Sequence, residues 1–346
     1  MRRSLAEQSI VITGASSGIG RAAALEFARR GASAVLAARN RVALEHVAEE
    51  IRESGGLAHV AVTDVAEWDQ VQRLAQEAVN WFGHIDTWVN NAAVSVYGTV
   101  EQLTAEEIGR VIQVNLLGQI YGMKVAAAQM RRQGGGTIIN VASVLSERAI
   151  PLQAAYCAAK HGIKGFTEAL RLELEREGSK IAVCLVLPSS INTPLFQHAR
   201  SKIGVAPMPL PPVYEASVVA SAIVFAAEHP RRRIVVGGAG KMLELAEKLS
   251  PRLLDRFMLS RDRFVRQQRT ARRDEGRDNL FQPLTGPGSS TGEFGEIAKS
   301  TSLYTRVFEL HPAVKRVVLG AALAGGLGLL WRRRNGGDDE SAQDAP

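Results

Sequence analysis

The stretch Ser9-Ile10-Val11-Ile12-Thr13-Gly14-Ala15-Ser16-Ser17-Gly18-Ile19-Gly20 decides the fold of this chain. Its apolar first half predicts a short buried strand, and residues 21–30 behind it have a helical pattern. Gly14 permits a tight turn, Gly18 lets a phosphate approach the backbone, and Gly20 lets helix and strand pack closely. Because a helix N-terminus also offers unpaired N–H groups, the stretch indicates a dinucleotide site, with an ordinary tight loop as the alternative.

A second motif is the pair Tyr156-x-x-x-Lys160. Residues four apart share one face of a helix, so the Lys160 ammonium can lie beside the Tyr156 phenol. A neighbouring cation favours phenolate and lowers the pKa of a tyrosine, which makes the hydroxyl a proton donor and acceptor for a carbonyl/alcohol pair. Taken alone, the spacing is also that of a chance pair on any helix.

Together, Thr13-Gly-x-x-x-Gly-x-Gly20 and Tyr156-x-x-x-Lys160 resemble the short-chain dehydrogenase/reductase family over about residues 5–240. Further motifs of that family follow in order: Asp64-Val65, Asn90-Asn91-Ala92-Ala93, Asn115, Ser143 and Pro188-Ser189-Ser190-Ile191-Asn192-Thr193-Pro194. Two positions depart from the pattern, because Ala93 and Ser189 stand where the family has glycine. We expect Ala93 to crowd the nicotinamide side slightly without abolishing binding.

The resemblance implies an NAD(P)-dependent oxidoreductase that interconverts a ketone or aldehyde and an alcohol. Ser143 is expected to hydrogen-bond the substrate oxygen and Tyr156 to pass the proton to or from it. Lys160 is expected to hold the nicotinamide ribose as well, and Asn115 to fix a water that links Lys160 to solvent. A catalytically silent NADP-binding scaffold, or a membrane-localised binding protein, is the alternative.

The residues at the end of the second predicted strand predict which cofactor is preferred. Ala38 occupies the position of the acidic residue that would bind the ribose 2′-hydroxyl of NAD, and Arg39 can pair with the 2′-phosphate of NADP. NADP(H), and with it a carbonyl reductase, is therefore favoured over NAD(H), with a solvated surface arginine as the alternative. The expected cofactor-binding residues are Gly14, Ser16, Ser17, Gly18, Ile19, Gly20, Arg39, Asp64, Val65, Asn91, Ala92, Tyr156, Lys160, Pro188, Ile191 and Thr193.

Helical and strand patterns alternate up to about residue 236. They predict an α/β fold of the doubly wound Rossmann type, with a parallel seven-stranded sheet, helices on both faces and a C-terminal helical extension. The expected organisation is a catalytic domain at 1–240, a basic amphipathic helical extension at 241–273, a flexible linker at 274–302 and a tail at 303–346. Residues 189–213 are apolar and proline-rich, which favours a substrate with a hydrophobic portion.

Charge and cysteine content limit the kinds of binding partner and the cellular compartment that we expect. The net charge is +7 and nine arginines fall between Arg252 and Arg277, which indicates a solvated helix face or, as alternatives, contact with anionic lipid or nucleic acid. With no nucleic-acid motif, no nucleic-acid partner is expected, and the seven histidines show no metal-ligand spacing. Two cysteines fit a reducing cytosol, and the N-terminus leaves no room for a signal peptide. A cytoplasmic catalytic domain is expected.

The tail contains an uncharged run, 317–331, between basic residues on both sides. As a helix it would span only about 22 Å, less than the roughly 30 Å of a bilayer core. Its basic flanks and Trp331 favour membrane contact, either as a transmembrane helix or at the interface. Packing on the core or on a partner is the alternative. The family resemblance also implies a homodimer or homotetramer.

Overall fold

The computed structural model describes residues 3–311 of the chain. The helices are α1 (Gly18–Arg29), α2 (Arg41–Glu53), α3 (Trp68–Phe82), α4 (Ala105–Ile112), α5 (Gly118–Gln133), α6 (Ala154–Arg176), α7 (Leu195–His198), α8 (Ala216–Glu228), α9 (Gly238–Leu249), α10 (Pro251–Leu259) and α11 (Arg263–Arg266). The strands are β1 (Ser9–Thr13), β2 (Ser33–Ala38), β3 (Ala58–Val62), β4 (Thr87–Asn90), β5 (Val96–Tyr97), β6 (Gly136–Val141), β7 (Ile181–Pro188), β8 (Ser190–Asn192), β9 (Arg200–Ser201), β10 (Val205–Pro207), β11 (Val213–Glu215), β12 (Arg233–Val236), β13 (Arg269–Arg273) and β14 (Ala298–Lys299).

Seven parallel strands form the central sheet in the order β12-β7-β6-β4-β1-β2-β3, which confirms the predicted Rossmann-type fold. Every residue of β1 is buried, because a parallel sheet is covered by helices on both faces. The strand order reverses between β1 and its neighbour β4, and clefts open at the carboxyl ends of strands at such a reversal. The fold therefore brings the glycine loop after β1 to the edge where a ligand can bind.

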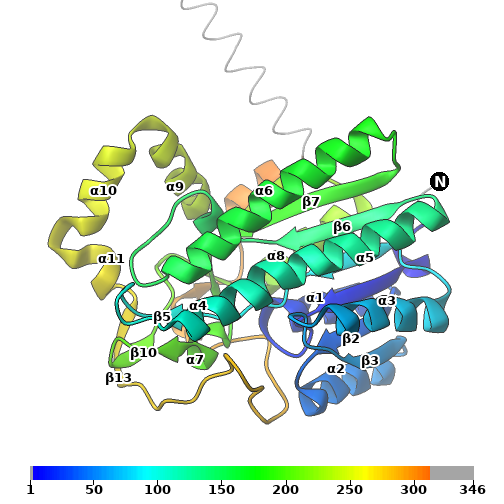
Figure 1. Cartoon of the computed structure of the whole chain (residues 1–346), viewed down its shortest axis with the longest axis horizontal. Coiled ribbons are helices and arrows are strands. Elements are labelled where there is room, and N and C mark those ends of the chain that lie inside the picture. The colour runs from blue at the N-terminus through cyan, green and yellow to red at the C-terminus, as the bar shows by residue number, and fades with distance from the viewer. Residues whose placement is uncertain (1–2, 312–346) are drawn as a thin grey trace, which may run out of the picture.

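Helices pack on both faces of the sheet (Figure 1). On one face, Phe27 of α1, Leu44 of α2 and Ile223 of α8 belong to one hydrophobic cluster. On the other, Met123 of α5 and Leu174 of α6 belong to a second cluster. These two layers hold most of the buried apolar residues, whose removal from water is the main favourable term in folding.

The helical stretch from Ala105 to Gln133 contains a π-helical turn, Gln113–Leu117, between α4 and α5. The extension expected to be helical to residue 273 instead ends in β13, which pairs antiparallel with β10. The side-chain pattern of residues 269–273 predicts a helix. Pairing with β10 satisfies the backbone hydrogen bonds of this segment as a strand instead.

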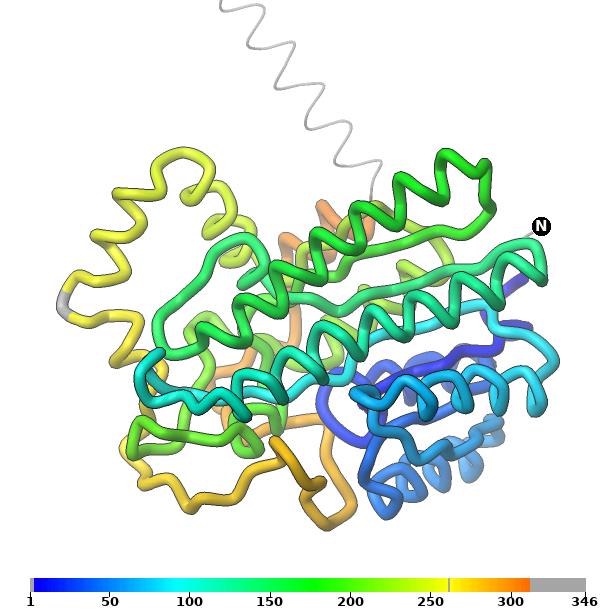
Figure 2. The backbone as a smooth tube through the Cα atoms, in the orientation of Figure 1, coloured from blue at the N-terminus to red at the C-terminus, as the bar shows by residue number. Residues whose placement is uncertain are grey.

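The chain beyond β13 also differs from the expected flexible linker. Residues 278–292, named the strap here, lie against the carboxyl edge of the sheet, where Figure 2 traces them as the yellow-orange loop. Further on, β14 pairs with β11. Thr305 then accepts a hydrogen bond from Gly237 N at 2.9 Å. The chain up to residue 311 is thus packed on the catalytic fold.

The uncharged run 317–331 lies outside the described residues. Within residues 3–311, no helix combines the length and the apolar composition that crossing a bilayer requires.

Candidate active site

The glycine loop is held in place by side chains from the end of β4. Asn91 Nδ2 donates to Thr13 O at 3.0 Å, and Asn91 N donates to Thr13 Oγ1 at 3.0 Å. A Cβ added to Gly20 would lie 2.2 Å from Gly14 O, and one added to Gly14 would lie 2.8 Å from Ala92 Cα. The loop therefore needs glycine at both positions.

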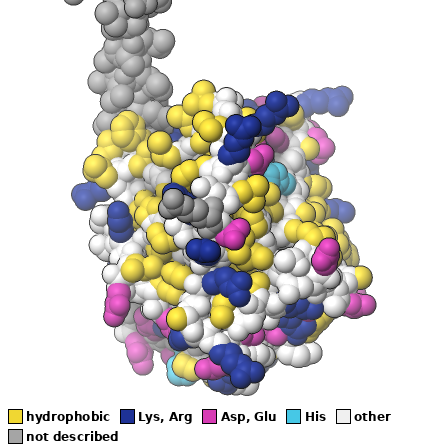
Figure 3. All heavy atoms as spheres, turned by 90° about the vertical axis from the view of Figure 1, so that its left-hand side faces the viewer, with side chains coloured by type: hydrophobic (Ala, Val, Ile, Leu, Met, Phe, Trp, Pro, Cys, Tyr) yellow, Lys and Arg dark blue, Asp and Glu magenta, His cyan; other side chains and the backbone are white. Residues whose placement is uncertain are grey.

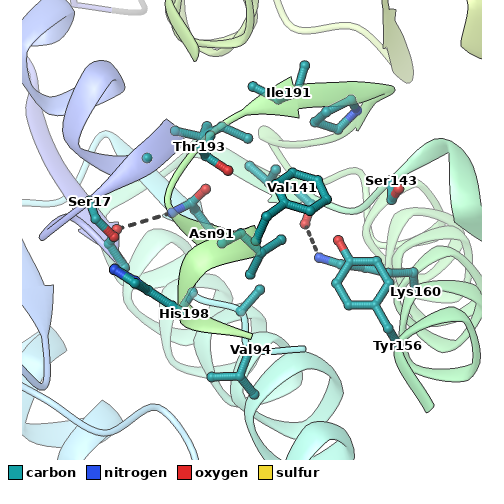
Figure 4. Close-up of a pocket in the computed structure, with 18 of the residues that line it drawn as sticks. Ser17, Asn91, Val94, Val141, Ser143, Tyr156, Lys160, Ile191, Thr193 and His198 are labelled. Atoms are coloured by element: carbon teal, nitrogen blue, oxygen red, sulfur yellow. Dashed lines mark hydrogen bonds between the residues drawn. The ribbon is translucent and has the colours of Figure 1, made fainter. Parts of the chain in front are cut away.

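The paired motif lies on α6, beside the end of β6. Lys160 is 1% exposed, and its Nζ donates to Val141 O at 2.9 Å and lies 5.3 Å from the centre of the Tyr156 ring. Ser143 lies two residues after the end of β6, and its Oγ accepts from Leu145 N at 3.1 Å. Figure 4 shows Tyr156, Lys160 and Ser143 on one side of the cavity, with Ser17 and Asn91 across from them.

Burial dominates the protonation of this pair. It raises the pKa of Tyr156, an effect that a negative charge on Cys157 would add to and that the Ser143 hydroxyl opposes. Burial also lowers the pKa of Lys160 from 10.5 to about 7. The sequence predicts a charged Lys160 that lowers the pKa of Tyr156. In the structure burial instead raises the pKa of the Tyr156 phenol and brings the pKa of Lys160 to about 7.

Asn115 does not face the cavity. Its side chain is fully buried in the π-helical turn, where Oδ1 accepts from Val94 N at 2.8 Å and Nδ2 donates to Val94 O at 2.9 Å. Val94 itself lines the cavity. The contact that the structure shows for Asn115 is therefore support of the cavity wall.

One cavity of about 350 Å³ runs along the carboxyl edge of the sheet. Ser143 and every expected cofactor residue except Gly20 line it: Gly14, Ser16, Ser17, Gly18, Ile19, Arg39, Asp64, Val65, Asn91, Ala92, Tyr156, Lys160, Pro188, Ile191 and Thr193. Gly20 packs behind the loop instead. The volume of the cavity lies in the range of small-molecule sites. The structure thus brings together two motifs more than 130 residues apart in sequence.

The two departures from the family pattern both lie on the wall of this cavity. Ser189 Oγ donates to Val236 O at 2.9 Å. A Cβ on Gly237 would lie 2.0 Å from Ser189 Oγ. Gly237 therefore leaves the space that the Ser189 hydroxyl occupies. Ala93 lines the cavity close to Ala92 and Val94.

Arg39 has partners that the sequence did not indicate. Its guanidinium donates to Leu280 O at 3.4 Å, to Phe281 O at 3.0 Å and to Asn279 O. Burial lowers the pKa of Arg39, which the charge of Asp64 opposes, yet an arginine stays charged in proteins. The charge predicted to face a 2′-phosphate thus lies between the cavity and the strap.

The sequence also did not single out a set of polar residues around the substrate side. Gln153 Nε2 donates to Gln268 Oε1 at 2.9 Å, and both residues line the cavity. His198 lines it too, and burial lowers the pKa of its imidazole. Apolar Leu243 and Phe264 complete this end. No motif spacing marks these residues, because loops and the extension bring them together.

In residues 3–311 no three His, Cys, Asp or Glu side chains are arranged to hold a metal ion.

The chain matches the short chain dehydrogenase family over residues 8–217 and belongs to it. It is similar to an uncharacterized oxidoreductase, YxnA, of Bacillus subtilis (strain 168), with 36% identity over 330 residues that cover 94% of this chain and 90% of the relative. A short-chain dehydrogenase/reductase from Burkholderia phymatum in complex with NAD superposes with a TM-score of 0.64 at 27% identity, over 71% of this chain and 95% of that one. An alcohol dehydrogenase from the archaeon Thermococcus sibiricus, complexed with 5-hydroxy-NADP, gives a TM-score of 0.58 at 26% identity, over 66% and 95%. The protein is thus an oxidoreductase of the short-chain dehydrogenase/reductase family.

Proposed function

We infer that this protein is an NADP(H)-dependent carbonyl reductase that interconverts a ketone or aldehyde and an alcohol. The observation that carries the proposal is the single cavity in which Ser143, Tyr156 and Lys160 share walls with the glycine loop. That arrangement supports a proton donor that acts beside a dinucleotide site. The bound nicotinamide supplies the hydride chemistry, and the protein supplies orientation and the proton.

Each of these side chains has a distinct task in the proposal. The Ser143 hydroxyl hydrogen-bonds the substrate oxygen and stabilises the charge that develops on it. Tyr156, kept protonated by its burial, gives that oxygen a proton in the direction of reduction. Lys160 is held against Val141 O beside the phenol and takes up a proton near pH 7, which favours the phenolate after transfer. Asn115 positions Val94 at the wall.

Preference for NADP(H) is supported by the end of β2. Ala38 provides no carboxylate for a ribose 2′-hydroxyl, and Arg39 lines the cavity next to it. A guanidinium pairs well with a phosphate through charge-assisted hydrogen bonds. NAD(H) is the less favoured cofactor.

The substrate side favours a molecule with a hydrophobic portion. Its lining is mostly apolar and includes Leu145, Ile150, Met208, Leu210, Leu243 and Phe264. Gln153 and Gln268 add polar groups that can fix the orientation of a substrate.

The direct test is NADPH oxidation by the full chain against a panel of aldehydes, ketones, quinones, steroids and acyl thioesters. We expect turnover of at least one apolar carbonyl compound, faster with NADPH than with NADH. If both nucleotides bind but no member of the panel is reduced, the binding-scaffold alternative replaces the proposal.

A further inference from the structure

The strap, 278–292, runs along the open side of the cavity. It starts at Asp278, whose carboxylate pairs with Arg200 at 2.8 Å, and it ends at Gly292, whose N–H donates to Asn192 O at 3.4 Å. Between these ends, Leu280 is fully buried in the hydrophobic cluster on the α3 and α5 side of the sheet. Both ends and one internal residue therefore fix the strap to the catalytic fold.

The strap contacts the residues that the sequence assigns to the adenosine and phosphate part of the cofactor. The carbonyls of 279–281 accept from Arg39, as described above. Gly18 N, at the start of α1, donates to Ser289 O at 2.7 Å. Between these two contacts the side chain of Asn40 donates to Leu284 O at 2.7 Å. The strap thus follows the adenosine end of the site from β2 to the glycine loop.

The strap is a wall of the cavity and does not fill it. Asn279, Pro283, Leu284 and Gly288 line the same space as the glycine loop, and that space keeps its volume of about 350 Å³. A segment that blocked the site would occupy this volume. Space for a bound group therefore remains beside the closed strap.

Arg39 can hold the strap and a phosphate at once. A guanidinium has five N–H donors, and the three strap carbonyls engage three of them, which leaves two. Arg39 also lines the cavity, so the same side chain borders both the strap and the space inside. A 2′-phosphate bound there would join the strap to the nucleotide through one side chain.

The strap also has features of a segment that opens locally. It is held mainly by its backbone, with Leu280 as its fully buried apolar side chain, while the adjacent Phe281 is 40% exposed. Gly286 and Gly288 have positive φ angles of 117° and 71°, which a glycine adopts without strain. Segments with few buried apolar contacts open locally at low free-energy cost.

We propose that the strap is a binding element of the cofactor site, which closes over the adenosine end of NADP(H) and retains it. The cofactor enters while the strap is lifted from Arg39 and Gly18, and the restored contacts enclose it. Cofactor release then requires the strap to open. The proposal rests on the proposed cofactor site, but it does not depend on which carbonyl compound is reduced.

Relatives differ in whether their sequence is long enough to include a segment that corresponds to the strap. The B. subtilis relative aligns over 94% of this chain, so 278–292 falls inside the aligned span. The B. phymatum enzyme, 95% of which matches only 71% of this chain, is shorter. Retention by a strap would therefore distinguish the longer chains of the family.

Gly288 offers a sharp test with a matched control. A Cβ at Gly288 would lie 2.2 Å from Ser16 O, so Gly288→Ala forces the strap away from the glycine loop. Gly276 has the same φ of 71°, and a Cβ there meets nothing within 4 Å. Gly276→Ala therefore carries the same backbone strain without the collision. The rate of NADPH release is measured on the full chain by stopped-flow fluorescence after mixing with excess NADP⁺.

We expect Gly288→Ala to release NADPH about tenfold faster, the upper range for the loss of one hydrogen bond such as that from Gly18. Gly276→Ala should stay within about twofold of the parent. Equal release rates in all three proteins would overturn the proposal. Tighter binding with faster association in Gly288→Ala would also overturn it, because the strap would then be an obstruction. If the parent binds neither NADPH nor NADH, the cofactor assignment itself fails.

A second measurement needs no variant. Hydrogen exchange of the strap amides is followed in the parent protein with and without saturating NADP⁺. Closure over the nucleotide predicts slower exchange at 280–290 when NADP⁺ is bound. Faster exchange would mean that the nucleotide displaces the strap, and unchanged exchange that the strap does not respond to it. Either result contradicts retention.

Discussion

The proton-transfer group is formed by two buried side chains whose charged states are both disfavoured. Tyr156 and Lys160 lie on one face of α6, and Lys160 is fixed to Val141 O by a hydrogen bond of 2.9 Å. Burial raises the pKa of the phenol and lowers that of the amine. The pair is therefore poised to exchange a proton near neutral pH, where small changes around it decide its charge.

Lys160 should make stability depend on pH. Its pKa is about 7 in the folded protein and near 10.5 in the unfolded chain. Between these values the unfolded chain binds more protons, so stability increases with pH across this window, and below about pH 7 the full cost of burying the charge is present. Urea unfolding of the parent and of Lys160→Met between pH 6 and pH 10, without cofactor, measures this. The stability advantage of Lys160→Met should shrink as pH rises, whereas a constant difference would refute the assigned pKa.

Cofactor preference should depend on positions 38 and 39. The double change Ala38→Asp with Arg39→Leu supplies a carboxylate for a ribose 2′-hydroxyl and removes the guanidinium. A charge-assisted hydrogen bond contributes roughly 1.5–3 kcal/mol, so NADPH affinity should fall at least about tenfold while NADH affinity rises. Fluorescence titration with both nucleotides measures the shift, and Arg41→Leu, on the exposed start of α2, is the control. A parent that already binds NADH more tightly would disprove the assignment.

At the scale of elements, the β1–α1 turn is the most constrained part of the site. A Cβ on Gly20 would meet Gly14 O at 2.2 Å and Asn91 Nδ2 at 2.6 Å. Gly20→Ala should therefore lower both the thermal midpoint and cofactor affinity. Gly165, on the exposed side of α6 with nothing within 4 Å of its Cβ, is the control, and Gly165→Ala should stabilise by roughly 0.5–1 kcal/mol. A Gly20→Ala protein as stable as the parent would show that the turn is not tightly packed.

Elements that carry a side-chain pattern could be predicted from the sequence, and a segment held by its backbone could not. The strands, the glycine loop and Ser143, Tyr156 and Lys160 follow from buried apolar runs and motif spacing, and the structure places them at one edge of the sheet. The strap was not foreseen, because it is held by backbone carbonyls on Arg39 and Gly18, which leave no trace in a side-chain pattern. Only Leu280, fully buried in a polar, turn-rich stretch, could have signalled packing.

At the scale of the whole molecule, α9 and α10 expose an unusually apolar face. Figure 3 shows hydrophobic side chains on this side of the molecule, with Lys and Arg among them. The exposed apolar residues are Met242, Leu245, Leu249, Leu253, Phe257 and Leu259. Larger exposed apolar patches are typical of contact sites. It lies on helices whose inner residues, such as Leu243, line the cavity.

We predict that the chain associates with membranes through residues 317–331. The run is uncharged and flanked by basic residues, and lipid would bury its side chains at roughly 25 cal/mol per Å². Cells expressing the full chain and a chain ending at His311 are fractionated, and the membranes are washed with carbonate. The shorter chain keeps the packed residues up to Thr305 and should retain reductase activity. Recovery of both chains in the soluble fraction would contradict the prediction, and release by carbonate would replace spanning by interfacial contact. The expected homodimer or homotetramer stays a prediction for size measurements in solution.

The central claim is that Tyr156 transfers the proton in an NADP(H)-dependent carbonyl reduction. The most direct measurement is single-turnover reduction of the best substrate of the panel by Tyr156→Phe, together with an NADPH titration of the same protein. Tyr121→Phe is the matched control, because Tyr121 packs against Trp68 at 5.3 Å between ring centres and does not line the cavity. We predict a rate about 10²–10⁴-fold below the parent for Tyr156→Phe, with NADPH affinity within a few-fold. A rate within about tenfold of the parent would contradict the account.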